Sequence, residues 1–359
     1  MGLLAYAMAG EGRGHASRSK SVADELLARG ESIVFVTGGD ALDFLNECYA
    51  DDARVHFVEI PVLRFVYTKI GKIKRIHLPK TMRNFFSFVW HMRGTLKAAQ
   101  AELQQRGLKP ELMICDFEPL APRLASRMRL PLVTLDNQHF YRHARLRDFS
   151  PIFWPGLLLL HFVCSVFVPH PDLTLICNFT LPEAIDETPR VRMIGPLVRK
   201  EIREAVLPVR TDDFVLCYLR ESIANESLKA LEELYCRAIV YGLSLREPRG
   251  KIIFKDISKT EFVEDLVRCD RVIGTSGAQL ISECIHLNKP LFVIPEKGHS
   301  EQIMNARLAE PLGVQRHRFG SLRKSMEAFL QSKPQLINPY KEEGARKAAE
   351  LILEYKNRK

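Results

Sequence analysis

Several features that often define a class of protein are missing from this sequence of 359 residues. It has no low-complexity segment and no short-period repeat, which excludes fibrous and repeat architectures. Its eight cysteines form no CxxC pair, so we expect reduced, buried thiols and not disulfides or a zinc site. Neither a basic leader nor a small-residue cleavage site opens the chain, and we therefore expect no secretory signal and a cytoplasmic location.

A hydrophobic run long enough to cross a membrane is also missing. Residues 149–171 carry no charged side chain, but Pro155 and Gly156 interrupt them. The remaining apolar stretch, Leu157–Val168, is too short for a helix that must cross about 30 Å of hydrocarbon. We expect it to form a buried or interfacial helix.

Acidic residues are absent from Ile60–Ala101, and this segment alone accounts for the net charge of +9. Its cations are Arg64, Lys69, Lys72, Lys74, Arg75, Lys80, Arg83, Arg93 and Lys97. The rest of the chain is neutral overall, unlike a uniformly basic nucleic-acid-binding protein.

Apolar segments with strand and helix periodicity alternate along both halves of the chain. The predicted strands are Leu3–Met8, Ile33–Val36, Leu112–Cys115, Leu132–Leu135, Phe214–Leu219, Lys251–Phe254, Arg271–Ile273 and Pro290–Ile294. The predicted helices are Ala16–Arg29, Leu228–Ala238, Glu261–Val267, Gln279–Leu287 and Glu301–Ala309. This alternation predicts an α/β protein of two doubly wound, Rossmann-like domains facing a cleft. We expect domains at 1–195 and 212–340, a linker at 196–211, and a C-terminal helix within 341–359 that crosses back to the first domain.

The strongest functional pattern lies between residues 274 and 305. A predicted strand ends before a turn with Gly274 and Gly277, and a helix follows; backbone amides at such a helix start suit a diphosphate. A carboxylate one turn later, Glu283, can accept hydrogen bonds from two ribose hydroxyls. The candidate nucleotide-sugar-binding residues are Gly274, Thr275, Ser276, Gly277, Ala278, Gln279, Glu283, Glu301, Gln302 and Asn305.

This stretch, Gly274 to Ala306, resembles the donor-binding region of GT-B glycosyltransferases. It is similar to the UDP-sugar transferases grouped with the lipid-linked N-acetylglucosamine transferase of peptidoglycan synthesis and to the UDP-glycosyltransferases. The resemblance implies that Glu283 binds the ribose, and that Glu301, Gln302 and Asn305 bind the donor sugar. It also implies a metal-independent site with UDP-sugar as substrate and no cofactor. Those families often have His or Arg where this chain has Thr275, so the α-phosphate contact should either be weaker or come from the backbone and Ser276.

A second glycine-rich loop, Gly10-x-Gly12-x-Gly14-His15, follows the first strand. It lacks the spacing and the early acid of a dinucleotide-binding loop, which disfavours a redox cofactor. It resembles the acceptor-facing loop of the same transferases. His15 is then the candidate general base and Asp116, at the end of another strand, the residue that orients it. His139, in the strand-end motif Asp136–His139, is a rival base.

We therefore expect an inverting hexosyltransferase in which His15 deprotonates the acceptor hydroxyl. For Ile60–Ala101, whose cations alternate with aromatic residues, four interpretations stay open. It is a solvated basic segment with partial core packing, a patch for an anionic membrane surface, a single-stranded nucleic-acid site, or a site for an acidic soluble partner. The membrane interpretation implies a lipid-linked acceptor and a peripheral position on the inner membrane face. Alternative functions are a sugar-nucleotide epimerase or hydrolase on the same scaffold, and a nucleic-acid-binding protein.

Overall fold

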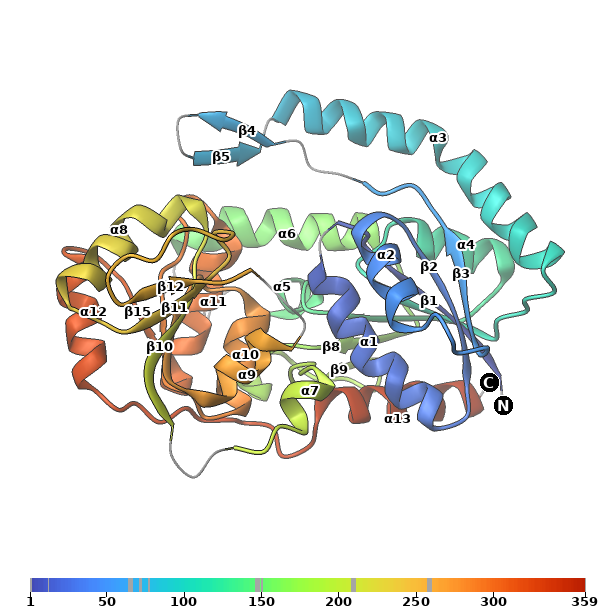
Figure 1. The fold of residues 1–359 in the computed structure, drawn as a ribbon. Coiled ribbons are helices and arrows are strands. Elements are labelled where there is room, and N and C mark those ends of the chain that lie inside the picture. Colours follow the sequence, from blue (N-terminus) through green and yellow to red (C-terminus); the bar gives the residue numbers. More distant parts are fainter. Residues whose placement is uncertain are drawn as a thin grey trace. The chain divides into compact units, whose positions relative to one another are not determined.

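The computed structural model describes residues 2–11, 13–63, 67–70, 73–76, 78–145, 149, 151–207, 211–256 and 260–358. Of the candidate residues above, Gly12, Arg64 and Lys72 lie outside these ranges. The chain forms two compact units (Figure 1). The first comprises Met1–Thr68, Ile76–Leu197 and Glu342–Lys359, and the second Lys69–Arg75 and Val198–Lys341.

The first unit is built on a parallel sheet in the order β3-β2-β1-β6-β7-β8-β9. Its strands are β1 (Leu3–Met8), β2 (Ser32–Thr37), β3 (Val55–Glu59), β6 (Leu112–Asp116), β7 (Leu132–Asp136), β8 (Leu173–Ile176) and β9 (Val191–Met193). The central strands are buried on both faces, as expected for parallel strands covered by helices. A separate two-stranded sheet pairs β4 (Tyr67–Ile70) with β5 (Ile73–Ile76).

Helices cover both faces of this sheet, following the alternation of side chains along each strand. They are α1 (Arg13–Ala28), α2 (Gly39–Cys48), α3 (Leu78–Gln105), α4 (Leu120–Met128), α5 (His139–His143), α6 (Trp154–Phe167) and α13 (Gly344–Asn357), with short 3₁₀ turns at Pro151–Phe153 and Pro182–Ala184. Leu4, Tyr6 and Met8 of β1 share one core with α1, α2 and α13. Ala5 and Ala7 share the opposite core with α3 and α4.

The second unit repeats the plan with a parallel sheet in the order β12-β11-β10-β13-β14-β15. Its strands are β10 (Asp212–Tyr218), β11 (Ala238–Tyr241), β12 (Ile252–Phe254), β13 (Cys269–Gly274), β14 (Leu291–Val293) and β15 (Gln315–Arg316). Its helices are α7 (Lys200–Arg203), α8 (Glu221–Glu233), α9 (Glu261–Arg268), α10 (Ala278–His286), α11 (Ser300–Ala309) and α12 (Leu322–Gln331), with a 3₁₀ turn at Glu310–Leu312. The prediction of two Rossmann-like α/β domains is confirmed.

Three local predictions need correction. Helix α1 begins at Arg13, so Gly14 and His15 belong to its first turn and not to the preceding loop. The helix expected to reach Ala238 ends at Glu233, because Ala238–Tyr241 is an apolar run that pairs with β10 as strand β11. The segment 196–211 is more than a connection, since it contains α7 and joins the second unit from Val198 onward.

The apolar stretch near residue 160 forms α6, a helix of 14 residues. Within the described ranges, no helix has the combination of length and hydropathy that crossing a membrane requires. All eight cysteines are free thiols, and six of them are buried.

Candidate active site

The two predicted catalytic residues lie next to each other at the carboxyl edge of the sheet of the first unit. Asp116 is the last residue of β6, and its carboxylate is fully buried. His15, in the first turn of α1, lies with Nδ1 2.9 Å from Oδ1 of Asp116. The imidazole side chain is 19% exposed, so part of it meets solvent while its Nδ1 lies against the carboxylate. The structure thus brings together two residues that are 101 positions apart in the chain.

A third residue, Arg18, completes this arrangement and was not anticipated from the sequence. Its Nε donates to Oδ2 of Asp116 at 2.7 Å, and its Nη2 donates to Oδ1. Burial alone would raise the pKa of Asp116, but the charges of Arg18 and His15 and their hydrogen bonds outweigh burial and hold the pKa below its usual range. Asp116 is therefore a permanent anion at neutral pH. The available signal was the position of Arg18, three residues after His15 on the same helix face.

Arg18 also acts on the ring of His15. Its Nη2 lies 2.8 Å from Nδ1 of His15, the same nitrogen that faces Asp116. A guanidinium only donates hydrogen bonds and a carboxylate only accepts them. Asp116 therefore favours a proton on Nδ1, which frees Nε2 to accept a proton, whereas Arg18 favours a lone pair on Nδ1. The balance between these two neighbours sets the tautomer of His15.

Gly10 and Gly14 differ in how closely other atoms approach them. A Cβ on Gly10 would lie 2.3 Å from the carbonyl oxygen of Gly38, so the approach of the two backbones requires glycine there. At Gly14 a Cβ would meet nothing within 4 Å. Gly14 is exposed and leaves open space beside His15.

The rival base, His139, is placed differently. Its side chain is fully buried, and its Nδ1 lies 2.7 Å from Oδ2 of Asp136. Its Nε2 is buried and has no hydrogen-bond partner among the described residues. Burial alone would raise the pKa of Asp136, but the charge and hydrogen bonds of His139 hold it below its usual value. His139 is inaccessible to an acceptor in this conformation, unlike His15.

In the second unit, the predicted glycine-rich turn joins β13 to α10. A Cβ on Gly274 would lie 2.6 Å from Cδ2 of Leu280, so glycine allows the strand end and the helix to pack closely. Gly277 is the N-cap residue of α10 and supplies no side-chain cap, and a Cβ there would meet nothing within 4 Å. The start of α10 is therefore open for a ligand to approach its backbone amides.

Most polar groups around this turn form hydrogen bonds within the protein that hold the turn in place. Ser276 is fully buried and donates its hydroxyl to the carbonyl of Gln302 at 2.7 Å. Asn305 donates to the carbonyl of Ser276 at 3.1 Å. Thr275 is 3% exposed, and its backbone amide donates to the carbonyl of Tyr218 at 3.1 Å. The hydroxyl proton of Ser276 is thus already used within the protein.

Hydrogen bonds also hold the loop before α11 against the first turn of that helix. Gln302 donates from Nε2 to Oε1 of Glu296 at 2.6 Å and accepts from the backbone amide of Glu296 at 3.1 Å. Glu296 also accepts from the hydroxyl of Ser222 at 2.5 Å and from Arg220 at 3.2 Å. Glu301 is half-buried, whereas Gln302 is 4% exposed. The sequence pattern gave no indication of Glu296, which links the loops after β10 and β14.

Glu283, the predicted ribose ligand, is 1% exposed and engaged on both oxygens. Arg199 donates from Nε to Oε1 at 2.7 Å and from Nη2 to Oε2 at 2.9 Å. Gln279 donates from Nε2 to Oε1 at 2.8 Å. A carboxylate has about four lone-pair directions, so about one stays available in this conformation. Nothing in the sequence indicated Arg199, which lies 84 positions before Glu283.

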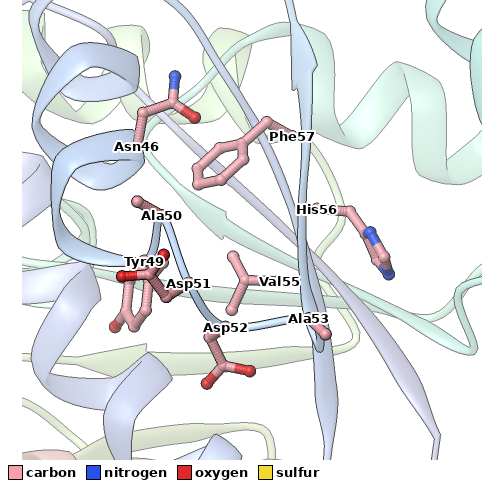
Figure 2. A pocket seen from close by; sticks show the side chains of 9 residues that line it. All are labelled: Asn46, Tyr49, Ala50, Asp51, Asp52, Ala53, Val55, His56 and Phe57. Carbon is pink, nitrogen blue, oxygen red and sulfur yellow. The ribbon is translucent and has the colours of Figure 1, made fainter.

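A hollow in the first unit lies at the turn between α2 and β3 (Figure 2). It is lined by Asn46, Tyr49, Ala50, Asp51, Asp52, Ala53, Val55, His56 and Phe57. It contains none of the predicted site residues, and Asp52 is paired with Arg54 at 2.7 Å. Among the described residues, no three His, Cys, Asp or Glu side chains are grouped so as to hold a metal ion.

The chain is similar to known proteins over most of its length. The sequence pattern of the family described as glycosyl transferase family 1 matches residues 3–334. An uncharacterized glycosyltransferase of Methanosarcina mazei is 27% identical over 338 residues, covering 86% of this chain and 83% of the relative. An uncharacterized glycosyltransferase of Methanosarcina acetivorans is 26% identical over 334 residues, with the same coverage.

Solved structures share the fold at low sequence identity. Arabidopsis thaliana UGT89C1, complexed with UDP-L-rhamnose, superposes with a TM-score of 0.68 at 13% identity, covering 99% of this chain and 98% of that one. Acinetobacter baumannii MurG superposes with a TM-score of 0.58 at 13% identity, over 100% of both chains. LpCGTa in complex with UDP gives 0.61 at 14% identity, covering 100% of this chain and 95% of that one.

Proposed function

The chain belongs to glycosyl transferase family 1 and is a glycosyltransferase of the GT-B type, and on that premise we propose that it transfers a hexose from a UDP-sugar to an acceptor hydroxyl with inversion. The observation that carries the donor assignment is the open start of α10 at Gly277. Two solved structures of this fold, with UDP in one and UDP-L-rhamnose in the other, support uridine as the base.

The donor diphosphate binds at the start of α10. Backbone amides of the first turn, including Ala278 and Gln279, donate to the phosphates, and the helix dipole favours their negative charge. Because the Ser276 hydroxyl already bonds the Gln302 carbonyl, the phosphate contact falls mainly to the backbone. The same amides stabilise the charge that develops on the departing UDP.

Glu283 binds the ribose. Its free lone-pair direction accepts one hydroxyl, and a small shift of Arg199 or Gln279 opens a second. Glu301 contacts the donor sugar, since it is the more exposed member of the predicted group. Gln302 and Asn305 contribute by holding α11 against the glycine-rich turn.

His15 is the general base. With Nδ1 protonated toward Asp116, its Nε2 takes the proton of the acceptor hydroxyl as the acceptor oxygen attacks the anomeric carbon. The bond from that carbon to the diphosphate oxygen breaks, and UDP leaves with the electron pair. Direct attack from the opposite side inverts the anomeric centre. His15 later returns the proton to water, and no metal takes part in the step.

We further propose that the acceptor is lipid-linked. Helices α3 and α6 of the first unit, the unit that carries His15, expose large apolar side chains. Such surfaces suit an enzyme whose acceptor is anchored in a bilayer.

The test of this function is binding followed by product analysis. We expect UDP to raise the melting temperature of the protein in EDTA, whereas TDP, GDP and NAD raise it less. With a UDP-sugar and a membrane extract as the source of acceptor, NMR of the product should show the inverted anomer. Free sugar or an isomerised sugar nucleotide, formed without acceptor, would instead indicate a hydrolase or an epimerase.

A further inference from the structure

Helix α3 presents two different faces. One face packs into the core beneath the first sheet through residues spaced three or four apart. Its members are Phe88, Met92, Leu96, Ala99 and Leu103. This stripe holds the helix on the sheet and thereby fixes which residues point away from the protein.

The opposite face of α3 is basic and aromatic. Phe86 is 63% exposed and Trp90 is 84% exposed. Arg83, Arg93 and Lys97 are exposed on the same stripe, again three or four positions apart. Within the described part of the chain none of these three cations is paired with a carboxylate. The stripe therefore combines uncompensated positive charge with two largely exposed aromatic side chains.

Helix α6 adds a second exposed apolar face in the same unit. Its exposed side chains are Trp154 at 41%, Leu158 at 53%, Leu159 at 61%, Phe162 at 63% and Val166 at 36%. None of its 14 residues is charged. At a rise of 1.5 Å per residue the helix is about 21 Å long, too short to cross the hydrocarbon core. Its end packs, through Phe167, into the same core as α3.

We propose that the outer faces of α3 and α6 dock on the surface of an anionic lipid bilayer. The cations of α3 are complementary to acidic headgroups, and indole and phenyl rings insert at the boundary between headgroups and acyl chains. The aliphatic residues of α6 argue against a nucleic acid, because Leu158, Leu159 and Val166 offer no ring on which a base could stack. Docking does not depend on sugar transfer, so it is tested without any donor.

The two tryptophans of the chain, Trp90 and Trp154, make the test direct, since each reports on one helix. The full chain with Trp90→Phe leaves Trp154 as the only indole, and Trp154→Phe leaves Trp90. Each variant is titrated with vesicles of phosphatidylcholine and phosphatidylglycerol, and with vesicles of phosphatidylcholine alone. With the anionic vesicles, we expect the fluorescence emission of both indoles to shift to shorter wavelength and the protein to co-sediment. High salt should weaken both effects.

A charge-matched pair of variants isolates the basic stripe. The triple change Arg83→Gln, Arg93→Gln and Lys97→Gln should weaken binding to anionic vesicles by about tenfold or more. Its control replaces three exposed cations elsewhere, Lys229→Gln, Lys333→Gln and Arg358→Gln, with the same loss of net charge. The control should bind nearly as the original protein does.

Several results would overturn the proposal. One is the absence of any shift of either indole with anionic vesicles, in protein whose circular dichroism is unchanged. Equal weakening in both triple variants would reduce the effect to net charge. If the indole emission shifts to the blue without lipid, and more so at higher protein concentration, the occupant is a second copy of the chain. Salt-sensitive binding to single-stranded RNA but not to vesicles would identify a nucleic acid as the occupant. None of these results bears on UDP binding, so the sugar-transfer proposal stands or falls separately.

Discussion

The guanidinium of Arg199 holds both carboxylate oxygens of Glu283, with Nε 2.7 Å from Oε1 and Nη2 2.9 Å from Oε2. The guanidinium also lies 5.6 Å from the centre of the Phe262 ring, in a cation–π arrangement. Arg199 comes from the segment just after the first unit ends, whereas Glu283 is in α10. This pair therefore fixes the start of the second unit against the helix that we propose binds the donor.

The first prediction concerns the stability of this pair. Arg199→Gln leaves a buried carboxylate without its cation and should lower the free energy of unfolding by about 2–3 kcal/mol, somewhat less than for a fully buried pair because Arg199 is 23% exposed. Adding Glu283→Gln should recover part of the loss, with a coupling of about 1–3 kcal/mol in urea unfolding. The exposed pair Arg268–Asp212 is the control, and Arg268→Gln should cost under about 1 kcal/mol. Additive effects at Arg199 and Glu283 would contradict this account.

A second prediction tests the helix start. Gly277 has φ −71° and ψ 135°, which any residue can adopt, and its Cβ position is open. Gly277→Asp and Gly277→Asn both provide a good N-cap and should fold equally well. Because only Asp brings a negative charge to the proposed diphosphate site, UDP should bind it at least about tenfold more weakly than Asn, as measured by calorimetry. Equal affinities in the two variants would place the diphosphate elsewhere.

The third prediction separates chemistry from donor binding. His15→Ala should lower the rate of transfer by about 10²- to 10⁴-fold, the usual contribution of a general base. The affinity for UDP should stay unchanged, since His15 and the proposed donor site belong to different units. Asp116→Asn should also reduce transfer, because an amide no longer favours the Nδ1-protonated tautomer. Transfer within about threefold of the original rate in His15→Ala would exclude this residue as the base.

A fourth prediction follows from Glu118, which comes two residues after Asp116. Burial raises the pKa of Glu118 to about 8, only partly opposed by the hydrogen bond from the Leu120 amide and the charge of Arg123. In the unfolded chain Glu118 loses its proton near its ordinary value of about 4.5, whereas the folded protein keeps the proton to about pH 8. Its contribution to stability is therefore fully present below about pH 4.5 and falls as pH rises toward 8.

The matched variant is Glu118→Gln, which keeps the shape and the acceptor for Leu120 but does not titrate. Relative to this variant, the original protein should lose up to about 5 kcal/mol of unfolding free energy between pH 4.5 and 8. Urea unfolding at several pH values measures the difference and cancels the titration of all other groups. A difference that is constant with pH would mean that Glu118 is already ionised in the folded state.

Much of the architecture was predictable because its causes are local. Apolar runs such as Leu112–Cys115 and Leu132–Leu135 are strands buried on both faces, and parallel strands direct their carboxyl ends to one edge. This placed Asp116 and Asp136 at that edge from sequence alone. The errors arose at boundaries: Ala238 continues a helical pattern but belongs to β11, because pairing with β10 outweighs local propensity.

Which residues pair with the charged side chains of the site could not be predicted from the sequence. It identified His15, Asp116 and Glu283 as candidates. The spacing of Arg18 from His15 hinted at one contact, but neither the bond from Arg18 to Asp116 nor the one from Arg199 to Glu283 was visible in the sequence. It favoured His15 as the base but left His139 as a rival, and the burial of the two side chains distinguishes them.

By itself, then, the sequence determined the parallel α/β units and the glycine-rich turns, since strand and helix periods and the need for glycine at close backbone approaches act over a few residues. The tertiary structure alone decided which carboxylate each arginine neutralises and which histidine meets solvent. Charge interactions and desolvation depend on distances through space, and the residues concerned are 84 to 101 positions apart in the chain.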